Sequence, residues 1–210
     1  MTRRQPQTFY TSDLHLGHEK VAAIRGFEST TDHDMALTER WMATVHPGDT
    51  VYVLGDLTGG SAWRRALEII GDMPGRKHLI AGNHDGVHPM HRRTYASHMP
   101  DYLRVFDTVA PFLRRRIGGH EVLLSHFPYA EYGEGPHRGG AAASRHNQFR
   151  LPNQGRPIIH GHTHQKERSW VLLTDQPEVP HACGLHVGVD AWDLTPAPQE
   201  ALISILDGWR

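Results

Sequence analysis

Cysteine is nearly missing from this sequence, with Cys183 as the only one among 210 residues. An intramolecular disulfide needs two cysteines, so a disulfide framework is excluded. Structural zinc sites usually draw on several thiolates, and the missing cysteine pairs therefore count against a structural zinc protein. We expect a cytoplasmic protein, in which any metal site is built from histidine, carboxylate and amide groups.

Long apolar runs and an excess charge of one sign are missing as well. No stretch approaches the roughly 20 apolar residues of a membrane span, and no apolar segment follows Arg3 and Arg4 at the N-terminus. The formal net charge is only −1, which does not favour binding to long duplex nucleic acid. The length suits one α/β domain, so we expect a single domain over residues 1–210, with neither a membrane nor a long duplex as partner.

Histidine, in contrast, is abundant, with 18 residues, and neutral imidazole is the commonest metal ligand. Five short motifs rich in histidine and aspartate each come just after an apolar run. They are Asp13-Leu14-His15, Gly55-Asp56, Gly82-Asn83-His84-Asp85, Ser125-His126 and Gly161-His162-Thr163-His164. In this order, each after an expected strand, the motifs predict ligands that meet at one edge of a sheet and hold two metal ions.

The apolar runs alternate with segments of helical spacing. We expect strands at residues 8–11, 50–54, 77–81, 121–124, 157–159 and 185–189. Helices are expected at 34–45 and 61–70, while 199–206 fits a helix or a strand. Gly118-Gly119-His120 separates the runs 112–117 and 121–124, which predicts a hairpin and hence mixed rather than purely parallel strands.

The residue types in the motifs indicate how the ions are held. Asp13 and His15 are two positions apart, so period-two geometry points both side chains to the same side. A carboxylate can bridge two ions and an imidazole cannot, which makes Asp56 the expected bridging ligand. Asn83 offers a neutral amide oxygen. The remaining expected ligands are His126, His162 and His164.

This ligand set predicts a phosphoesterase. Two divalent ions, two carboxylates and a bridging hydroxide leave one positive charge, which suits a phosphate. Mixed oxygen and nitrogen ligands suit Mn²⁺, Fe or Zn²⁺ better than Ca²⁺, and we expect Mn²⁺. Paired metals about 3.5–4 Å apart can activate water and clamp the phosphoryl oxygens during in-line attack.

His84 and Asp85 are candidate catalytic residues. His84 could protonate the leaving-group oxygen, a general-acid role usually worth about 10²–10⁴-fold, or it could be a further imidazole ligand. Asp85 could accept a hydrogen bond from this imidazole and hold its orientation, or it could cap a turn or helix.

Residues 129–156 form an expected long loop, rich in glycine and with little apolar periodicity. No Asp or Glu occurs from residue 135 to 166, whereas arginine recurs. The segment is therefore either a cover over an anionic ligand or a solvated surface loop. The candidate substrate-binding residues are Arg138, Arg145, Arg150 and His18, and His18 could equally begin a helix. Asp190 and Trp192 are expected to serve in packing and a turn.

The motif order resembles that of the calcineurin-like metallophosphoesterase family, whose pattern is D-x-H, G-D, G-N-H-[D/E], a further His, and G-H-x-H. The resemblance runs from residue 11 to 164, with Ser125 where many members have Gly. Residues 11–18, 123–129 and 187–192 are similar to the small, single-domain bacterial and phage members. The resemblance implies a four-layer αββα sandwich of mixed sheets, with a dimetal site at the carboxyl ends of the strands.

The resemblance also implies which residues hold each ion and places His84 at the family's general-acid position. One ion would be held by Asp13, His15, Asp56 and His164, and the other by Asp56, Asn83, His126 and His162. Every ligand position and the general-acid position carry the family's residue. We therefore expect a catalytic protein rather than a non-catalytic scaffold on a degenerate phosphoesterase fold.

The substrate is less constrained than the reaction. We expect hydrolysis of small nucleotide diesters, such as 2′,3′-cyclic nucleotides, by attack of a hydroxide that bridges the two metals. A phosphomonoesterase, a protein phosphatase and a nuclease are the alternatives within the enzyme class. Oligomeric state is left open.

Overall fold

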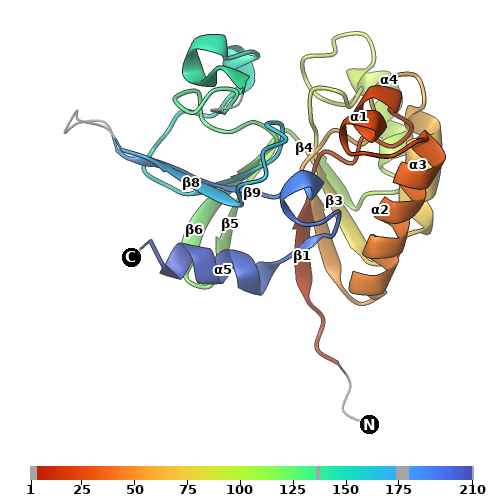
Figure 1. The fold of residues 1–210 in the computed structure, drawn as a ribbon, viewed down its shortest axis with the longest axis horizontal. Coiled ribbons are helices and arrows are strands. Elements are labelled where there is room, and N and C mark those ends of the chain that lie inside the picture. The colour runs from red at the N-terminus through yellow and green to blue at the C-terminus, as the bar shows by residue number, and fades with distance from the viewer. Residues whose placement is uncertain (1–3, 136–137, 174–179, 210) are drawn as a thin grey trace.

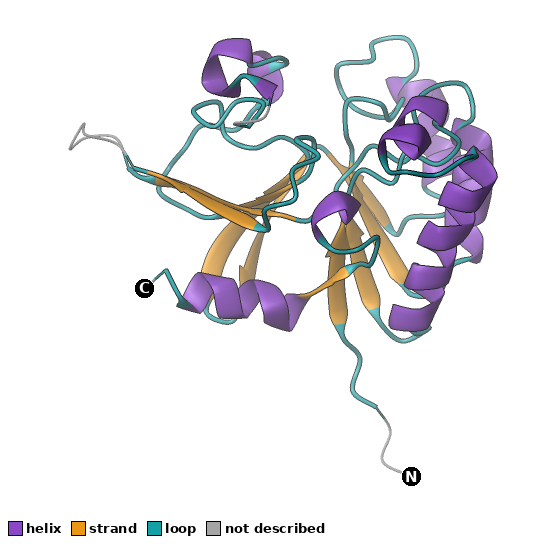
Figure 2. Ribbon diagram, in the orientation of Figure 1, coloured by secondary structure: helices purple, strands orange, loops and turns teal. Residues whose placement is uncertain are grey.

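Two mixed β-sheets lie face to face, with helices over the outer side of the first (Figures 1 and 2). The computed structural model describes residues 4–135, 138–173 and 180–209. The predicted α/β fold with two mixed sheets is confirmed. In the described residues, no helix has the length and apolar character needed to cross a membrane.

The first sheet has the strand order β10-β1-β2-β3-β4. Its strands are β1 (Thr8–Thr11), β2 (Thr50–Val53), β3 (Arg76–Ile80), β4 (Thr108–Ala110) and β10 (Ala197–Pro198). Strands β1 to β4 run parallel, and β10 is antiparallel to β1. The helices of this half are α1 (Glu19–Ile24), α2 (Thr30–Thr44), α3 (Trp63–Asp72) and α4 (Tyr95–Tyr102).

The second sheet has the order β5-β6-β7-β9-β8. Its strands are β5 (Phe112–Ile117), β6 (His120–Ser125), β7 (Ile158–His160), β8 (Ser169–Leu172) and β9 (Ala182–His186). The strands β6, β7 and β9 are parallel, whereas β5 and β8 are antiparallel edge strands. The long segment 129–156 covers this sheet: its Tyr129, Tyr132 and Leu151 pack with Ile158 and Trp170. The described part of this layer is mostly loop and includes the short 3-10 helices Gly140–Ala143 and Asn147–Phe149.

Alternation along the strands separates two main cores. On β2, Val51 and Val53 pack with Trp41 of α2 and Ile70 of α3, whereas Tyr52, and Leu54 just after the strand, pack in the core shared with the second sheet. The core between the sheets is closed by α5 (Gln199–Asp207). Residues 199–206, which fitted either a helix or a strand, are helical because spacing by four buries Leu202 and Leu206 on one face.

Most predicted elements occur within a few residues of their expected positions. The hairpin is confirmed, with Ile117 opposite His120 and both turn glycines at positive φ, as a two-residue turn of type I′ requires. The expected strand at 185–189 is wrong in its position: β9 ends at His186, and Val189–Ala191 forms a 3-10 helix.

Candidate metal centre

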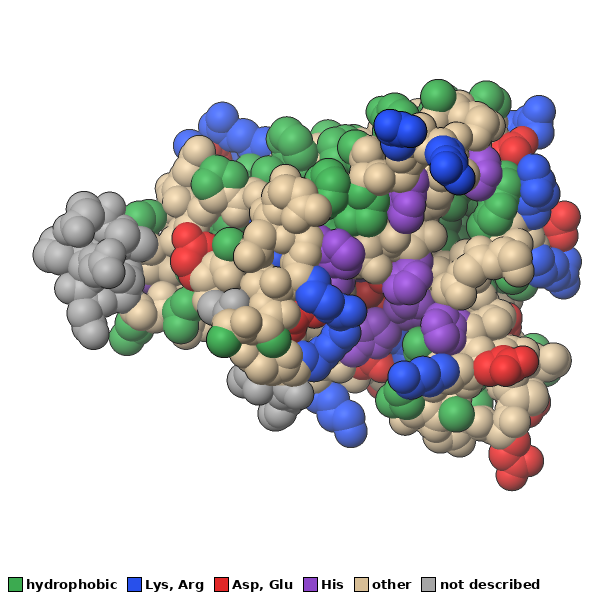
Figure 3. Space-filling view, turned by 90° about the horizontal axis from the view of Figure 1, so that it is seen from above, with side chains coloured by type: hydrophobic (Ala, Val, Ile, Leu, Met, Phe, Trp, Pro, Cys, Tyr) green, Lys and Arg blue, Asp and Glu red, His purple; other side chains and the backbone are tan. Residues whose placement is uncertain are grey.

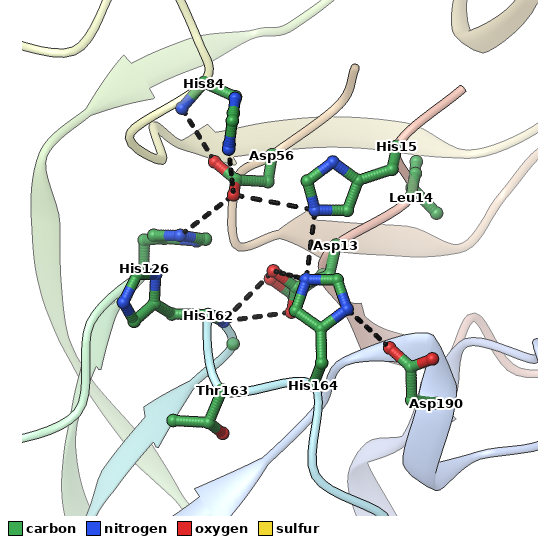
Figure 4. A network of polar contacts seen from close by, with 12 residues as sticks. Asp13, Leu14, His15, Asp56, His84, His126, His162, Thr163, His164 and Asp190 are labelled. Carbon is green, nitrogen blue, oxygen red and sulfur yellow. Dashed lines mark hydrogen bonds and ion pairs between the residues drawn. The ribbon is translucent and has the colours of Figure 1, made fainter. Parts of the chain in front are cut away.

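The five motifs meet at one end of the two sheets. Each follows the carboxyl end of a strand, namely β1, β2, β3, β6 and β7, where parallel strands bring their following loops together. Figure 4 shows the ring of side chains that results, and in Figure 3 histidines gather on this face with Lys and Arg on either side. The structure therefore brings together all seven predicted ligands.

Six of these residues form two groups that could each hold one ion. Asp13, His15 and His164 make the first group, and Asp56, His126 and His162 make the second, with the donor atoms of each group within 4.8 Å of one another. The seventh, Asn83, places its Oδ1 3.2 Å from His126 Nε2.

Asp56 lies between the two groups. Its Oδ2 is 3.4 Å from His126 Nε2 and 3.7 Å from His15 Nε2. The same carboxylate is thus near a nitrogen donor of each group, which is the place a bridging ligand must occupy.

The chemistry of these donors fits divalent transition metals. Asp13 and Asp56 are almost completely buried, and a buried carboxylate is costly unless a positive charge compensates it. His15 Nε2 and His164 Nε2 face each other at 3.0 Å, close enough for one ion to accept both lone pairs. Mixed nitrogen and oxygen donors are the set expected for Mn²⁺, Fe or Zn²⁺.

Charges within the cluster hold its protonation states when no ion is bound. Burial opposes ionisation of Asp56, but the charge and hydrogen bond of His126 together with the charges of His15 and His84 outweigh it and hold the pKa of this carboxyl well below its usual range. Burial likewise lowers the pKa of His126, yet Asp56, Asp13 and the Leu54 carbonyl together outweigh it and raise the pKa to about 9. Burial raises the pKa of Asp13, against the opposing charge of His164.

The backbone at the predicted ligands is strained. Five of them, Asp13, His15, Asp56, His162 and His164, have φ between 49° and 71°, in the left-handed region that residues other than Gly rarely adopt. Such conformations cost on the order of 1–3 kcal/mol each and concentrate at functional sites. The strained positions thus coincide with the residues whose side chains form the two groups of ligands.

Two motif glycines allow the close approach of β2 and β3 at this edge. Gly55 has φ +86°, and a Cβ there would lie 2.4 Å from the Gly82 nitrogen. A Cβ on Gly82 would lie 2.4 Å from Asp56 Oδ1. The expected sharp turn at Gly55 is therefore present, and both positions require glycine for space as well.

Asp85 does not have the predicted role beside His84. Its Oδ2 accepts the backbone N–H groups of Gly82 and Asp56, and its Oδ1 accepts that of Leu57. Both oxygens are thus occupied by backbone, because the turn after β3 directs the side chain inward to the end of β2. Asp85 caps this turn, which corrects its interpretation as an orienting group.

A cleft of about 420 Å³ opens over the centre and contains both His84 and His18 in its lining. The His84 side chain is 43% exposed, with Nε2 3.9 Å from Asp56 Oδ2, while its backbone N–H donates to Asp56 Oδ1. His84 is thus placed at the entrance, within reach of a group bound at the metals. His18 also begins α1, where its Nδ1 accepts the Val21 N–H, so its helix-start role is confirmed and its substrate contact stays a prediction.

The three candidate arginines occupy different environments. Arg138 and Arg145 line the cleft, together with Lys20. Arg150 is buried and donates to the carbonyls of Pro128 and Gly133 and to the Glu134 carboxylate. The predicted substrate contact of Arg150 is therefore wrong: the loop uses this guanidinium to satisfy its own carbonyls.

Two acidic residues escaped the sequence analysis. Asp190 was assigned to a turn, yet its Oδ2 lies 3.2 Å from His164 Nδ1, and it also accepts Arg25. Glu134 was given no role, yet its Oε1 lies 3.1 Å from His162 Nε2. Glu134 directly precedes the segment without acidic residues, so four arginines with one adjacent acid were the signal that could have identified it.

Comparisons with known proteins agree with this geometry. A family model described as the calcineurin-like phosphoesterase superfamily domain matches residues 8–174. The chain is 42% identical over 195 residues to the Gene 66 protein of Mycobacterium phage L5, covering 88% of this chain and 87% of that protein. It is 41% identical over 198 residues to the Gene 66 protein of Mycobacterium phage D29, with 90% of each covered. A solved protein of unknown function from Aquifex aeolicus shares the fold, with a TM-score of 0.63, 20% identity, and 96% of this chain and 100% of that chain covered.

Proposed function

The chain belongs to the calcineurin-like phosphoesterase superfamily, and we propose that it hydrolyses small phosphodiesters with the aid of two divalent metal ions, preferably Mn²⁺. The observation that carries the proposal is the position of Asp56 between two groups of ligands. Single-domain organisation over residues 1–210 and a cytoplasmic location, expected from the lone Cys183, belong to the same proposal.

The residues of the centre would serve as metal ligands and as a proton donor. Asp13, His15 and His164 would hold one ion, and Asn83, His126 and His162 the other, with Asp56 shared. Bound at these residues, two ions would activate water and neutralise the phosphoryl oxygens during in-line attack. His84, at the entrance of the cleft, would donate a proton to the departing oxygen.

The cleft supports a nucleotide-sized substrate. A volume of about 420 Å³ lies in the range typical of sites for small molecules. The centre with its bridging hydroxide would retain one positive charge, which matches the single negative charge of a phosphodiester. We propose small nucleotide diesters, with 2′,3′-cyclic nucleotides first among them.

A phosphomonoesterase is the second candidate, and the rim of the cleft favours it. Lys20, Arg138 and Arg145 add positive charge around the centre, and a phosphomonoester brings a second negative charge that these cations could offset.

The decisive experiment compares matched substrates on protein reconstituted with Mn²⁺. The panel contains a bis-aryl diester, the aryl monoester with the same leaving group, 2′,3′- and 3′,5′-cyclic nucleotides, and single-stranded DNA. We expect the diester to have the higher kcat/KM of the matched pair and the 2′,3′-cyclic nucleotides to be hydrolysed. A higher kcat/KM for the monoester would replace this proposal with the second candidate.

A further inference from the structure

Glu134 joins the arginine-bearing loop to a predicted metal ligand. This carboxylate is buried, with only 2% of the residue exposed. Its Oε1 accepts the Arg145 backbone N–H at 3.1 Å and Arg150 Nη2 at 2.7 Å, and lies 3.1 Å from His162 Nε2. Its Oε2 accepts Arg145 Nη2 at 3.0 Å and is 3.8 Å from Arg138 Nη2. One side chain therefore contacts three arginines and the imidazole at once.

These contacts determine which nitrogen of His162 faces the centre. A carboxylate surrounded by three guanidinium groups is ionised and offers only lone pairs, so the hydrogen of the neutral imidazole lies on Nε2. The lone pair then lies on Nδ1, the nitrogen available to a metal ion. The ring is also packed against Phe127, at 4.9 Å between centroids, which limits its rotation.

Two other histidine ligands, His126 and His164, show the same arrangement with different acceptors, whereas the buried Nδ1 of His15 has no hydrogen-bond partner. His126 Nδ1 donates to the Leu54 carbonyl at 2.7 Å, and His164 Nδ1 faces Asp190. Acceptors of this kind fix the orientation of a metal-binding imidazole and raise its basicity, and losing one typically costs about 10–100-fold in metal affinity. Of these acceptors, Glu134 is the one that also contacts Arg138 and Arg145 of the cleft.

We propose that Glu134 is a positioning residue that sets the affinity of the metal site at Asp56, Asn83, His126 and His162, and that links the filling of this site to the placement of Arg138 and Arg145. An ion held by Nδ1 would draw electron density from the ring and would strengthen the hydrogen bond from Nε2 to the Glu134 carboxylate. The carboxylate is then held more firmly against the two arginines. This inference rests on the metal centre of the proposed function.

Metal binding is the direct test, with Mn²⁺ titrated into metal-free protein and followed by calorimetry and electron paramagnetic resonance. Glu134→Gln removes the charge, and Glu134→Asp keeps it but withdraws the carboxylate from His162. We expect both variants to bind one ion as the wild type does and the other about 10–100-fold more weakly. At Mn²⁺ concentrations that fill both sites of the wild type, the resonance spectrum of the wild type should be that of two coupled ions. The spectrum of the Glu134 variants should be that of a single ion.

Glu131→Gln is the matched control, because the same chemical change is made three residues away on an exposed side chain of the same loop. It should bind both ions as the wild type does. Tryptic cleavage at Arg138 and Arg145 supplies the second measurement: Mn²⁺ should slow it in the wild type and in Glu131→Gln, but not in Glu134→Gln.

The outcomes separate this inference from the proposed function. A wild type that takes up no ion would refute the metal centre itself. A wild type that binds two ions, together with Glu134 variants of unchanged affinity, would overturn the role of Glu134 alone. If circular dichroism shows that Glu134→Gln does not fold, the Mn²⁺ affinity of Glu134→Asp tests the inference, since this variant retains the negative charge facing the arginines.

Discussion

His164 Nδ1 lies 3.2 Å from Asp190 Oδ2, while Nε2 on the other side of the same ring faces His15 and Asp13. The Arg25 guanidinium donates to both oxygens of Asp190 and to the Asp13 carbonyl. Burial opposes a charge on His164, but the hydrogen bond with Asp190 and the negative charges of Asp13 and Asp190 together outweigh it and raise the pKa of the imidazole. A residue of the 3-10 helix that follows β9 thus orients a predicted ligand from the fifth motif.

Asp190→Asn should lower the metal affinity of the site at Asp13, His15 and His164 by about 10–100-fold, because the His164 imidazole loses its charged acceptor. Elemental analysis after dialysis against a fixed Mn²⁺ concentration measures the loss. Asp193→Asn, at a side chain that is 83% exposed, is the control and should retain both ions. Equal metal content in the two variants would contradict the role given to Asp190.

The three arginines of the loop should respond differently to substitution. Arg138→Ala and Arg145→Ala should raise KM for anionic substrates with kcat nearly unchanged, the pattern of an interaction made equally in ground and transition states. Arg150→Ala should instead destabilise the fold by about 3–5 kcal/mol, because it leaves Glu134 buried beside an empty space.

Steady-state kinetics and urea unfolding separate these effects, with Arg114→Ala on exposed β5 as the control for removal of a surface arginine. If KM is unchanged in both Arg138→Ala and Arg145→Ala, this part of the segment is a surface loop without a role in substrate binding. Wild-type stability of Arg150→Ala would refute its structural role.

The meeting of the five motifs was predictable because the sequence shows both the motifs and the apolar runs that precede them. Each motif follows an apolar run, and parallel strands bring such motifs to one edge without further information. Asp85 and Arg150 were misassigned for a common reason. Each side chain bonds to the backbone instead of pointing into the cleft. Asp85 accepts backbone N–H groups at the turn after β3, and Arg150 donates to carbonyls of its own loop. Only the folded chain shows these contacts.

The unpredicted elements lack a strong local pattern. α4 contains Pro100, which sequence patterns treat as the end of a helix, and β4 has only three residues. Strand β8 is an antiparallel edge strand whose position depends on pairing with β9. Contacts such as Glu134 with His162, 28 residues apart, form only when the loop packs on the second sheet, so residue spacing could not reveal them.

His84→Gln should retain both ions and lose activity in proportion to how poor the leaving group is. An activated aryl oxide departs without a proton, whereas a ribose alkoxide needs one. We expect most aryl-ester turnover to remain and a cyclic nucleotide to be hydrolysed about 10²–10⁴-fold more slowly. Equal slowing of both substrates would indicate charge stabilisation instead, and loss of an ion would make His84 a ligand.

Metal binding should release protons between pH 7 and 9. In the metal-free protein, burial lowers the pKa of His126, but Asp56, Asp13 and the Leu54 carbonyl together outweigh it and raise the pKa to about 9, so the imidazole is protonated at neutral pH. A metal ion requires the neutral ring, and affinity should therefore rise with pH across this window. The stabilisation of the metal-free fold by the ion pair has the opposite trend and is lost as pH rises through about 9.

Calorimetric titrations of Mn²⁺ in buffers of different ionisation enthalpy count the released protons. An affinity that is flat from pH 7 to 9, with no proton release, would contradict this assignment.

The central claim, a two-ion centre that hydrolyses phosphodiesters, is tested most directly by titrating exhaustively metal-free protein with Mn²⁺ while measuring turnover of a bis-aryl diester. Asp56→Asn serves as the matched variant, because both groups of ligands lose their shared carboxylate. We predict negligible turnover without metal, a rise that saturates when two ions are bound per chain, and little recovery in Asp56→Asn at the same Mn²⁺ concentrations. Full turnover in the metal-free wild type, or two filled sites and normal turnover in Asp56→Asn, would contradict the account.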